Sequence, residues 1–237
     1  MSMRLRVSES IWSAFPGLYL GVVVARGIDN SRPAPELTAS LREAQSWIRE
    51  EYDAETLPQL PFIQTWRNAY TSFGAKPKKH ASSVESLFRL TLRGVDLRPI
   101  NPVVDAYNLV SLRFGVPAGG DDLDHVQGDI TLDFAAGGEG FTPLNSESRE
   151  AARPGEVIYR DGRDVLCRRW NWRECDRTKM TEDTRNVCLV VEALPPKGRA
   201  DVEEALQDLI RLLAAYCGGT LRSEVLDRGL PEIRMDV

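Results

Sequence analysis

Long apolar runs are missing from this chain of 237 residues. No segment approaches the roughly 20 consecutive apolar residues that a transmembrane helix needs. The N-terminal segment MSMRLR also lacks the apolar core and the small-residue cleavage site of a signal peptide. We therefore expect a cytoplasmic protein with no membrane partner. A hydrophobic content of 42% is nevertheless enough for a substantial core.

Cysteine and histidine are both scarce. The four cysteines, at 167, 175, 188 and 217, form no CxxC pair, and the only histidines are His80 and His125. Because a structural zinc site takes four Cys or His ligands at regular spacing, we expect reduced, mostly buried thiols and no metal or other cofactor. The histidines lie in separate segments without a Ser or Cys partner, which favours surface or satisfied side chains over a histidine-assisted nucleophile.

Common catalytic signatures are absent as well. The chain has no GxGxxG, GxxxxGK[ST], GxSxG or HExxH motif, and the glycine-rich segment 137–140 indicates only a turn. What remains is carboxylate and amide chemistry in Asn108, Asp121, Asp122, Asp124, Glu174 and Asp176. A buried carboxylate can bind an ammonium group, orient water or act as a base. The alternative is that these acids cap turns and pair with arginines.

The net charge of −5 argues against general binding of nucleic acids, DNA included. Positive charge is nevertheless concentrated in two segments. Between Trp66 and Arg98 there are seven Lys and Arg residues and two acidic residues. Between Arg160 and Lys179 there are seven Lys and Arg residues and four acidic residues. Such surfaces can hold a phosphate backbone. Solvated faces and intramolecular ion pairs are the alternative.

Hydrophobic periodicity predicts helices early in the chain and strands in the middle. Apolar residues recur at helical spacing in residues 35–52, 63–73, 84–91 and 103–114. Apolar or alternating runs predict strands at residues 18–25, 130–134, 156–160, 165–170 and 186–192. We expect a glycine-rich turn at 118–124 and a final helix from Val202 to Tyr216, capped by Asp201.

This order of elements favours an α+β fold. We expect one domain over residues 1–237, with a central mixed or antiparallel sheet flanked by helices. Its parts are a helical N-terminal portion (about 1–100), a core (about 101–193) and a C-terminal helix and tail (about 194–237).

Three short motifs follow one another along the chain. VVDAYN at 103–108 is similar to VVDVTN, and GVP at 115–117 with DLD at 122–124 is similar to GQPxHAFDxD. Glu174, followed by Thr184 and the strand from Asn186, is similar to GGExSGV…ETxNVLLE. With these motifs, residues from about 65 to 193 resemble the B3/B4-type editing domain of bacterial phenylalanyl-tRNA synthetase β subunits.

The resemblance implies a freestanding B3/B4-like domain that acts in trans on mischarged tRNA. Such an enzyme hydrolyses the ester between a wrong amino acid and the 3′-terminal ribose. Water makes the attack, so the reaction requires no protein nucleophile, metal or cofactor. A noncatalytic RNA- or amino-acid-binding module with the same fold is the alternative, and a hydrolase of free small molecules is a third.

The resemblance also implies roles for individual residues. Glu174 would hold the ammonium group of the amino acid or the attacking water, and Asn108 would orient the ester. In the substrate pocket Tyr107 stands where the family has threonine, and Gly119 where it has histidine. The loss of that histidine argues against tyrosyl-tRNA as the substrate.

Two acids, three arginines and three lysines complete the implied site. Asp121 (phenylalanine in the family) and Asp122 favour a cationic side chain, because a carboxylate pairs well with a guanidinium group. Some freestanding relatives act on tRNA for arginine that carries canavanine, so canavanyl-tRNA is the leading substrate prediction. We place Arg168 among the substrate-binding residues. The acceptor end of the tRNA is assigned to Lys76, Lys78, Lys79, Arg169 and Arg173.

Overall fold

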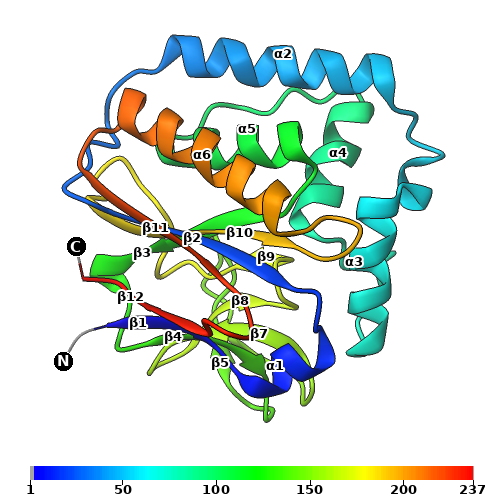
Figure 1. Cartoon of the computed structure of the whole chain (residues 1–237), viewed down its shortest axis with the longest axis vertical. Helices are drawn as coiled ribbons and strands as arrows, with labels where there is room; N and C mark the ends of the chain where they lie inside the picture. Colours follow the sequence, from blue (N-terminus) through cyan, green and yellow to red (C-terminus); the bar gives the residue numbers. More distant parts are fainter. Residues whose placement is uncertain (1–2, 237) are drawn as a thin grey trace.

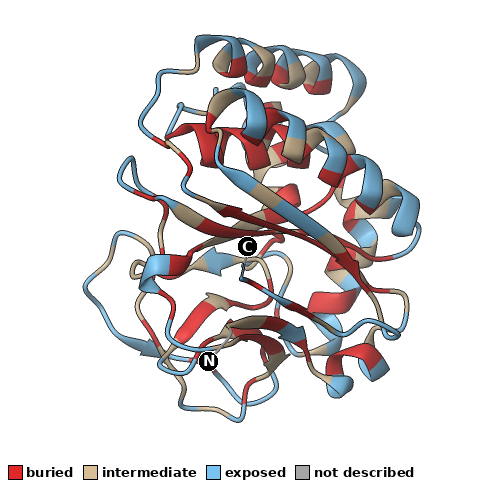
Figure 2. Cartoon of the chain, turned by 60° about the vertical axis from the view of Figure 1, so that its left-hand side comes forward, coloured by how far each residue is buried: buried red, intermediate tan, exposed pale blue. Residues whose placement is uncertain are grey.

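In the computed structural model, which describes residues 3–236, helices and two sheets form successive layers. A four-stranded sheet lies between the main group of helices and a six-stranded sheet (Figure 1). Buried residues gather where these layers meet (Figure 2). The predicted α+β fold with a mixed sheet is confirmed.

The four-stranded sheet is antiparallel throughout. Its strand order is β11 (Thr220–Leu226), β2 (Tyr19–Arg26), β10 (Asn186–Ala193) and β3 (Ala118–Asp122). The six central residues of β2 are all buried, as the apolar run at 18–25 predicted. That run is apolar because β2 is covered on both faces, by helices and by the second sheet.

Six α-helices and two short 3-10 helices occur among the described residues. Helices α5 (Pro102–Phe114) and α6 (Arg199–Tyr216) pack on the four-stranded sheet, and α2 (Pro35–Glu51) packs on α5. The other helical elements are α1 (Glu9–Ala14), η1 (Leu57–Gln59), α3 (Pro61–Ser72), α4 (Ser83–Leu92) and η2 (Leu123–His125). Within residues 3–236, no helix is long and apolar enough to span a membrane.

The six-stranded sheet is mixed, because β1 and β4 are parallel and its other pairs are antiparallel. Its strand order is β12 (Glu232–Arg234), β1 (Arg4–Val7), β4 (Ile130–Phe134), β7 (Val157–Arg160), β8 (Val165–Arg168) and β9 (Arg173–Glu174). A small separate sheet pairs β5 (Gly140–Phe141) with β6 (Glu150–Ala151).

Side chains cap the start of several helices. Ser82 caps α4 by accepting the N–H of Glu85, and the side chain of Asn101 caps α5. The predicted start of α6, at Val202, is wrong. The helix begins at Arg199, and Asp201 stabilises it from inside by accepting the Gly198 N–H at 2.8 Å.

The predicted turn at 118–124 is wrong, because residues 118–122 form strand β3, antiparallel to β10. Its glycines permit a very close approach of the two backbones. A Cβ at Gly120 would lie 2.1 Å from the carbonyl oxygen of Cys188. Glycine here therefore indicates a strand that packs closely against its neighbour and not a reversal of the chain.

Candidate functional site

A cavity of about 380 Å³ lies between the two sheets. Cys188, Val190 and Glu192 of β10 line one wall, and residues of β4, β7 and β8 line the other. Residues of α4, α5 and β3 and the segment 170–174 also contribute to the lining. The cavity lies where β3 and β9, the edge strands of their respective sheets, come together.

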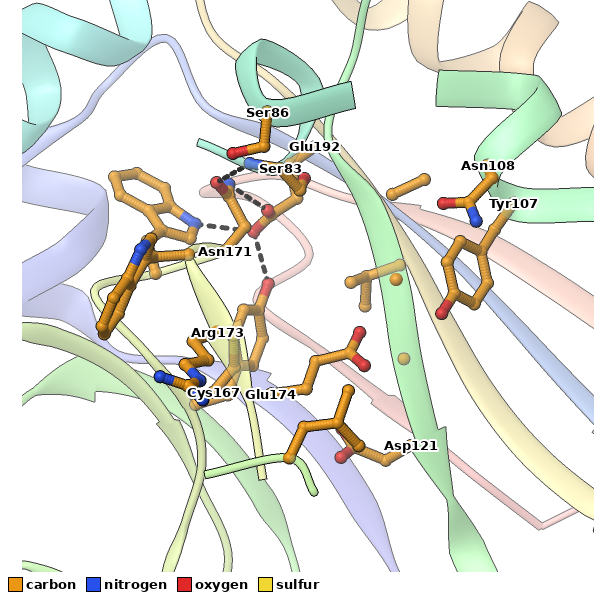
Figure 3. A pocket seen from close by; sticks show the side chains of 18 of the residues that line it. Ser83, Ser86, Tyr107, Asn108, Asp121, Cys167, Asn171, Arg173, Glu174 and Glu192 are labelled. Atoms are coloured by element: carbon orange, nitrogen blue, oxygen red, sulfur yellow. Dashed lines mark hydrogen bonds between the residues drawn. The ribbon is translucent and has the colours of Figure 1, made fainter. Parts of the chain in front are cut away.

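Two acidic side chains meet at this junction of edge strands. Glu174 of β9 and Asp121 of β3 both line the cavity and lie close together in Figure 3. The backbone N–H of Gly120 is close enough to the Glu174 carboxylate to favour its charged form. The Thr178 hydroxyl donates to Asp121 Oδ1 at 2.6 Å. The structure thus brings together two acids that lie far apart in sequence.

Both acids are shifted toward neutral pH. Burial, and then the charge of Asp121, raises the pKa of Glu174 to about 7 against the effect of the Gly120 N–H. Burial raises the pKa of Asp121 to about 6, although the hydrogen bond from Thr178 works in the other direction. Carboxyl groups that titrate near pH 7 inside a cavity are characteristic of functional sites.

Gly119 leaves room for the Glu174 carboxylate, since a Cβ at position 119 would lie 3.0 Å from Glu174 Oε1. We expect Gly119→Ala to displace this carboxylate and to lower the affinity for a cationic ligand about tenfold, the equivalent of 1.4 kcal/mol. Calorimetric titration and thermal unfolding measure the two effects separately. An unchanged affinity in a folded variant would show that the carboxylate position does not matter.

Helix α5 contributes Tyr107 and Asn108 to the lining. Burial raises the pKa of the Tyr107 phenol well above its ordinary value, so the hydroxyl stays protonated at neutral pH. Asn108 is half-buried and presents an amide, which can both donate and accept a hydrogen bond. In Figure 3 both side chains lie on the same side of the pocket, away from Asn171.

A buried network that the sequence reasoning missed forms another part of the wall. Glu192 accepts hydrogen bonds from Tyr159 and Trp170 at 2.6 Å and from Asn171 at 2.7 Å. Asn171 in turn accepts a hydrogen bond from the Tyr70 hydroxyl at 2.9 Å. Burial raises the pKa of Glu192. The available signal was a glutamate near the end of an apolar strand, because such a residue needs buried donors.

Asp122 does not line the cavity, although it neighbours Asp121. Successive side chains of a strand point to opposite faces, and the buried Asp122 carboxylate accepts the Thr184 hydroxyl at 2.6 Å and the Asp124 N–H at 3.0 Å. Asp122 therefore stabilises the end of the strand, and the prediction that it binds the substrate is wrong.

Arg168 also lies away from the cavity wall. Its guanidinium group makes two hydrogen bonds to Glu156, at 2.8 and 3.0 Å, and a third to Glu150 at 2.7 Å. Arg169 reaches the same Glu156 at 3.0 Å. Both arginines are buried. Arg168 and Arg169 therefore form a buried ion-pair network with the glutamates and do not make the ligand contacts predicted for them.

The remaining predicted cations are on the surface. Lys76, Lys78 and Lys79 are exposed in the loop between α3 and α4, outside the cavity lining. Arg173 is exposed and does line the cavity. Among the described residues, no cluster of three or more His, Cys, Asp and Glu could hold a metal ion. All four cysteines are free thiols.

Comparisons with known proteins agree on one family. A family model described as B3/4 domain matches residues 65–218. The phenylalanine–tRNA ligase β subunit of Fusobacterium nucleatum is 26% identical over an alignment of 160 residues, and the match covers 58% of this chain and 20% of that protein. The same subunit of Oleidesulfovibrio alaskensis is 36% identical over 75 residues, 31% of this chain and 9% of that protein.

A solved structure shows the same fold. It is an N-terminal fragment of the phenylalanyl-tRNA synthetase β subunit from Pyrococcus horikoshii, with a TM-score of 0.50 and 16% identity over 92% of this chain and 50% of that one. The chain thus spans a fifth or less of the full-length relatives and half of the solved fragment. The family match covers well over half of the chain, which therefore belongs to the B3/4 domain family.

Proposed function

We propose that this protein hydrolyses the ester of mischarged tRNA and acts in trans. The observation that carries the proposal is the convergence of Glu174, Asp121 and Asn108 on one cavity of about 380 Å³. This volume lies within the range typical of small-ligand pockets. The similarity to β subunits of phenylalanine–tRNA ligases supports tRNA as the partner.

In the proposed reaction Glu174 is the general base. Its carboxylate takes a proton from water as the water oxygen attacks the ester carbon. Collapse of the tetrahedral intermediate breaks the bond to the ribose oxygen, which receives the proton. The products are the free amino acid and uncharged tRNA. A pKa of about 7 suits this role, because a base is most effective when its pKa is near the working pH.

Asn108 and Asp121 would orient the substrate. An amide of Asn108 directed at the ester carbonyl would stabilise the negative charge that develops on its oxygen. Asp121 would pair with a cationic group on the amino acid side chain. Within residues 3–236, Arg173 is the only Lys or Arg that lines the cavity. The lining acids therefore favour a cationic side chain, and canavanyl-tRNA is our leading substrate.

A panel of mischarged tRNAs, incubated with purified protein without added metal, tests this function. The panel contains canavanyl-, arginyl- and tyrosyl-tRNA. Release of canavanine with arginyl-tRNA spared would support a trans-editing enzyme. Retention of every ester, together with tight tRNA binding, would favour the noncatalytic module. Turnover of amino acid esters that carry no tRNA, with none of the charged tRNAs, would favour a hydrolase of small molecules.

The proposal predicts a pH dependence of ligand binding. The pKa values of Glu174, about 7, and Asp121, about 6, mean that both carboxyls gain negative charge as the pH rises from 5.5 to 8. The affinity for L-arginine amide should therefore increase about tenfold over this range, equivalent to one pKa unit. Citrulline amide, with the same α-amine and no guanidinium charge, is the control in calorimetric titrations. Parallel profiles for both ligands would contradict recognition of a cationic side chain.

A further inference from the structure

Trp172 has unusual surroundings for a tryptophan at the edge of a cavity. It is half-buried, lines the cavity, and follows a turn in which Arg169 and Trp170 have positive φ angles of 48° and 68°. The guanidinium carbon of Arg169 lies 4.5 Å from the centroid of its ring, and that of Arg173 lies 5.9 Å away. An aromatic surface is thus combined with two cations at the cavity that Glu174 also lines.

Arg169 and Arg173 differ in how freely their side chains can move. Arg169 is buried and paired with Glu156 at 3.0 Å, so it is fixed against the indole. Arg173 is exposed to solvent at the cavity. The fixed cation lies over the Trp172 ring and supports its position. The exposed cation can meet a charged group that arrives from outside.

His80 connects this tryptophan to the lysine loop. The prediction of surface or satisfied histidines is wrong for His80, whose buried Nδ1 has no hydrogen-bond partner among the described residues. Its ring meets Trp172 edge-to-face, with 4.5 Å between centroids. The loop that carries Lys76, Lys78 and Lys79 leads directly into His80. The lysine loop therefore ends in a residue that contacts the indole.

The start of α4 adds an unsatisfied polar atom at the same cavity. Ser83 lines the cavity, and its buried hydroxyl oxygen has no hydrogen-bond partner among the described residues. A buried polar atom without a partner is rare in native structures and calls for an explanation such as a bound molecule. Ser83 lies near Asn171, which precedes Trp172 in the chain, and its N–H donates to Asn171 Oδ1 at 3.4 Å.

We propose that Trp172 is the stacking platform for the terminal nucleoside of the nucleic acid partner, with Arg173 pairing with its phosphate. The inference rests on the proposed function. The scissile ester is attached directly to the terminal ribose, so the base must lie at the mouth of a cavity that holds the amino acid. Stacking on an aromatic ring beside cations is how proteins bind single-stranded ends without reading a duplex.

Binding of the trinucleotide CCA tests this site without any catalytic readout. Trp172→Leu should weaken binding of labelled CCA about tenfold in fluorescence anisotropy, whereas Trp172→Phe keeps an aromatic face and most of the affinity. Trp47→Leu is the control, since Trp47 is an exposed tryptophan of α2 outside the cavity lining. Equal affinities of wild type and a folded Trp172→Leu variant would overturn the proposal.

Two further measurements separate this inference from the proposed function. Trp172→Leu should raise the KM for mischarged tRNA much more than it lowers kcat, and the rise in KM should be much smaller for the corresponding amino acid methyl ester, which carries no nucleoside; an equal loss on both substrates would indicate a structural role. If the wild type hydrolyses neither ester, the proposed function fails while the CCA measurement still decides the role of Trp172.

Crosslinking keeps the test valid if Trp172→Leu does not fold. Irradiation of the wild type with CCA that ends in 8-azidoadenosine should label a peptide that contains Trp172 or its neighbour Arg173. Labelling confined to other peptides would overturn the assignment.

Discussion

Replacing Glu174 with glutamine is expected to lower the rate of deacylation by about 10²- to 10⁴-fold, the range typical of a lost general base. The variant preserves the shape of the side chain and the space beside Gly119, but it removes the ability to accept a proton. The fold should be retained, because this side chain is half-buried at the cavity and makes no ion pair with another described residue. Single-turnover hydrolysis of canavanyl-tRNA measures the chemical step.

Two other carboxylates serve as comparisons in that experiment. Glu147→Gln removes an exposed carboxylate outside the cavity lining and should leave the rate unchanged. Asp121→Asn should mainly weaken the preference for a cationic side chain. The wild-type rate should increase as Glu174 ionises near pH 7, and this dependence should disappear in Glu174→Gln. A rate for Glu174→Gln close to wild type would remove Glu174 from the mechanism.

The elements predicted well from the sequence are those whose signal is local. The spacing of apolar residues predicts α2 and α5, and a run of β-branched residues predicts β2, because burial acts on consecutive residues. Strand β3 could not be predicted in this way. Glycine and aspartate are poor strand formers, and β3 exists because its backbone pairs with β10, nearly 70 residues later in the chain.

The candidate site was predictable in chemistry but not in detail. The motifs identify the segments that contribute Asn108, Asp121 and Glu174, and the structure gathers all three on one cavity. The separation of Asp121 from Asp122 depends on which face of β3 each side chain occupies, and only the register with β10 fixes that. Without a strand prediction, the two acids were indistinguishable.

Arg168 shows a different limit of sequence reasoning. The sequence shows an arginine near Glu174, which is compatible with a ligand contact. It does not show that Glu150 and Glu156, which are 18 and 12 residues earlier in the chain, reach the same guanidinium group. Whether a charge is free or paired depends on long-range contacts, so the charge pattern alone overestimated the number of ligand-binding cations.

The second large effect concerns this ion-pair network. Glu156→Gln is expected to lower the free energy of unfolding by about 3 kcal/mol, because removing one member of a buried ion pair leaves uncompensated charge in the interior. The Glu156 side chain is only 6% exposed, and those of its partners Arg168 and Arg169 are 4% and 8% exposed. Urea unfolding measures the change as a lower midpoint with an unchanged slope.

Glu232→Gln is the matched control for that variant. Its pair with Arg4 has a similar N–O distance of 2.8 Å, but the two side chains are 43% and 39% exposed. A solvent-exposed pair contributes only about 0–1 kcal/mol. A small change for both variants would show that Glu156 does not stabilise the buried arginines. A large change for Glu156→Gln alone would establish that the ion pairs of Glu156 with Arg168 and Arg169 support the fold.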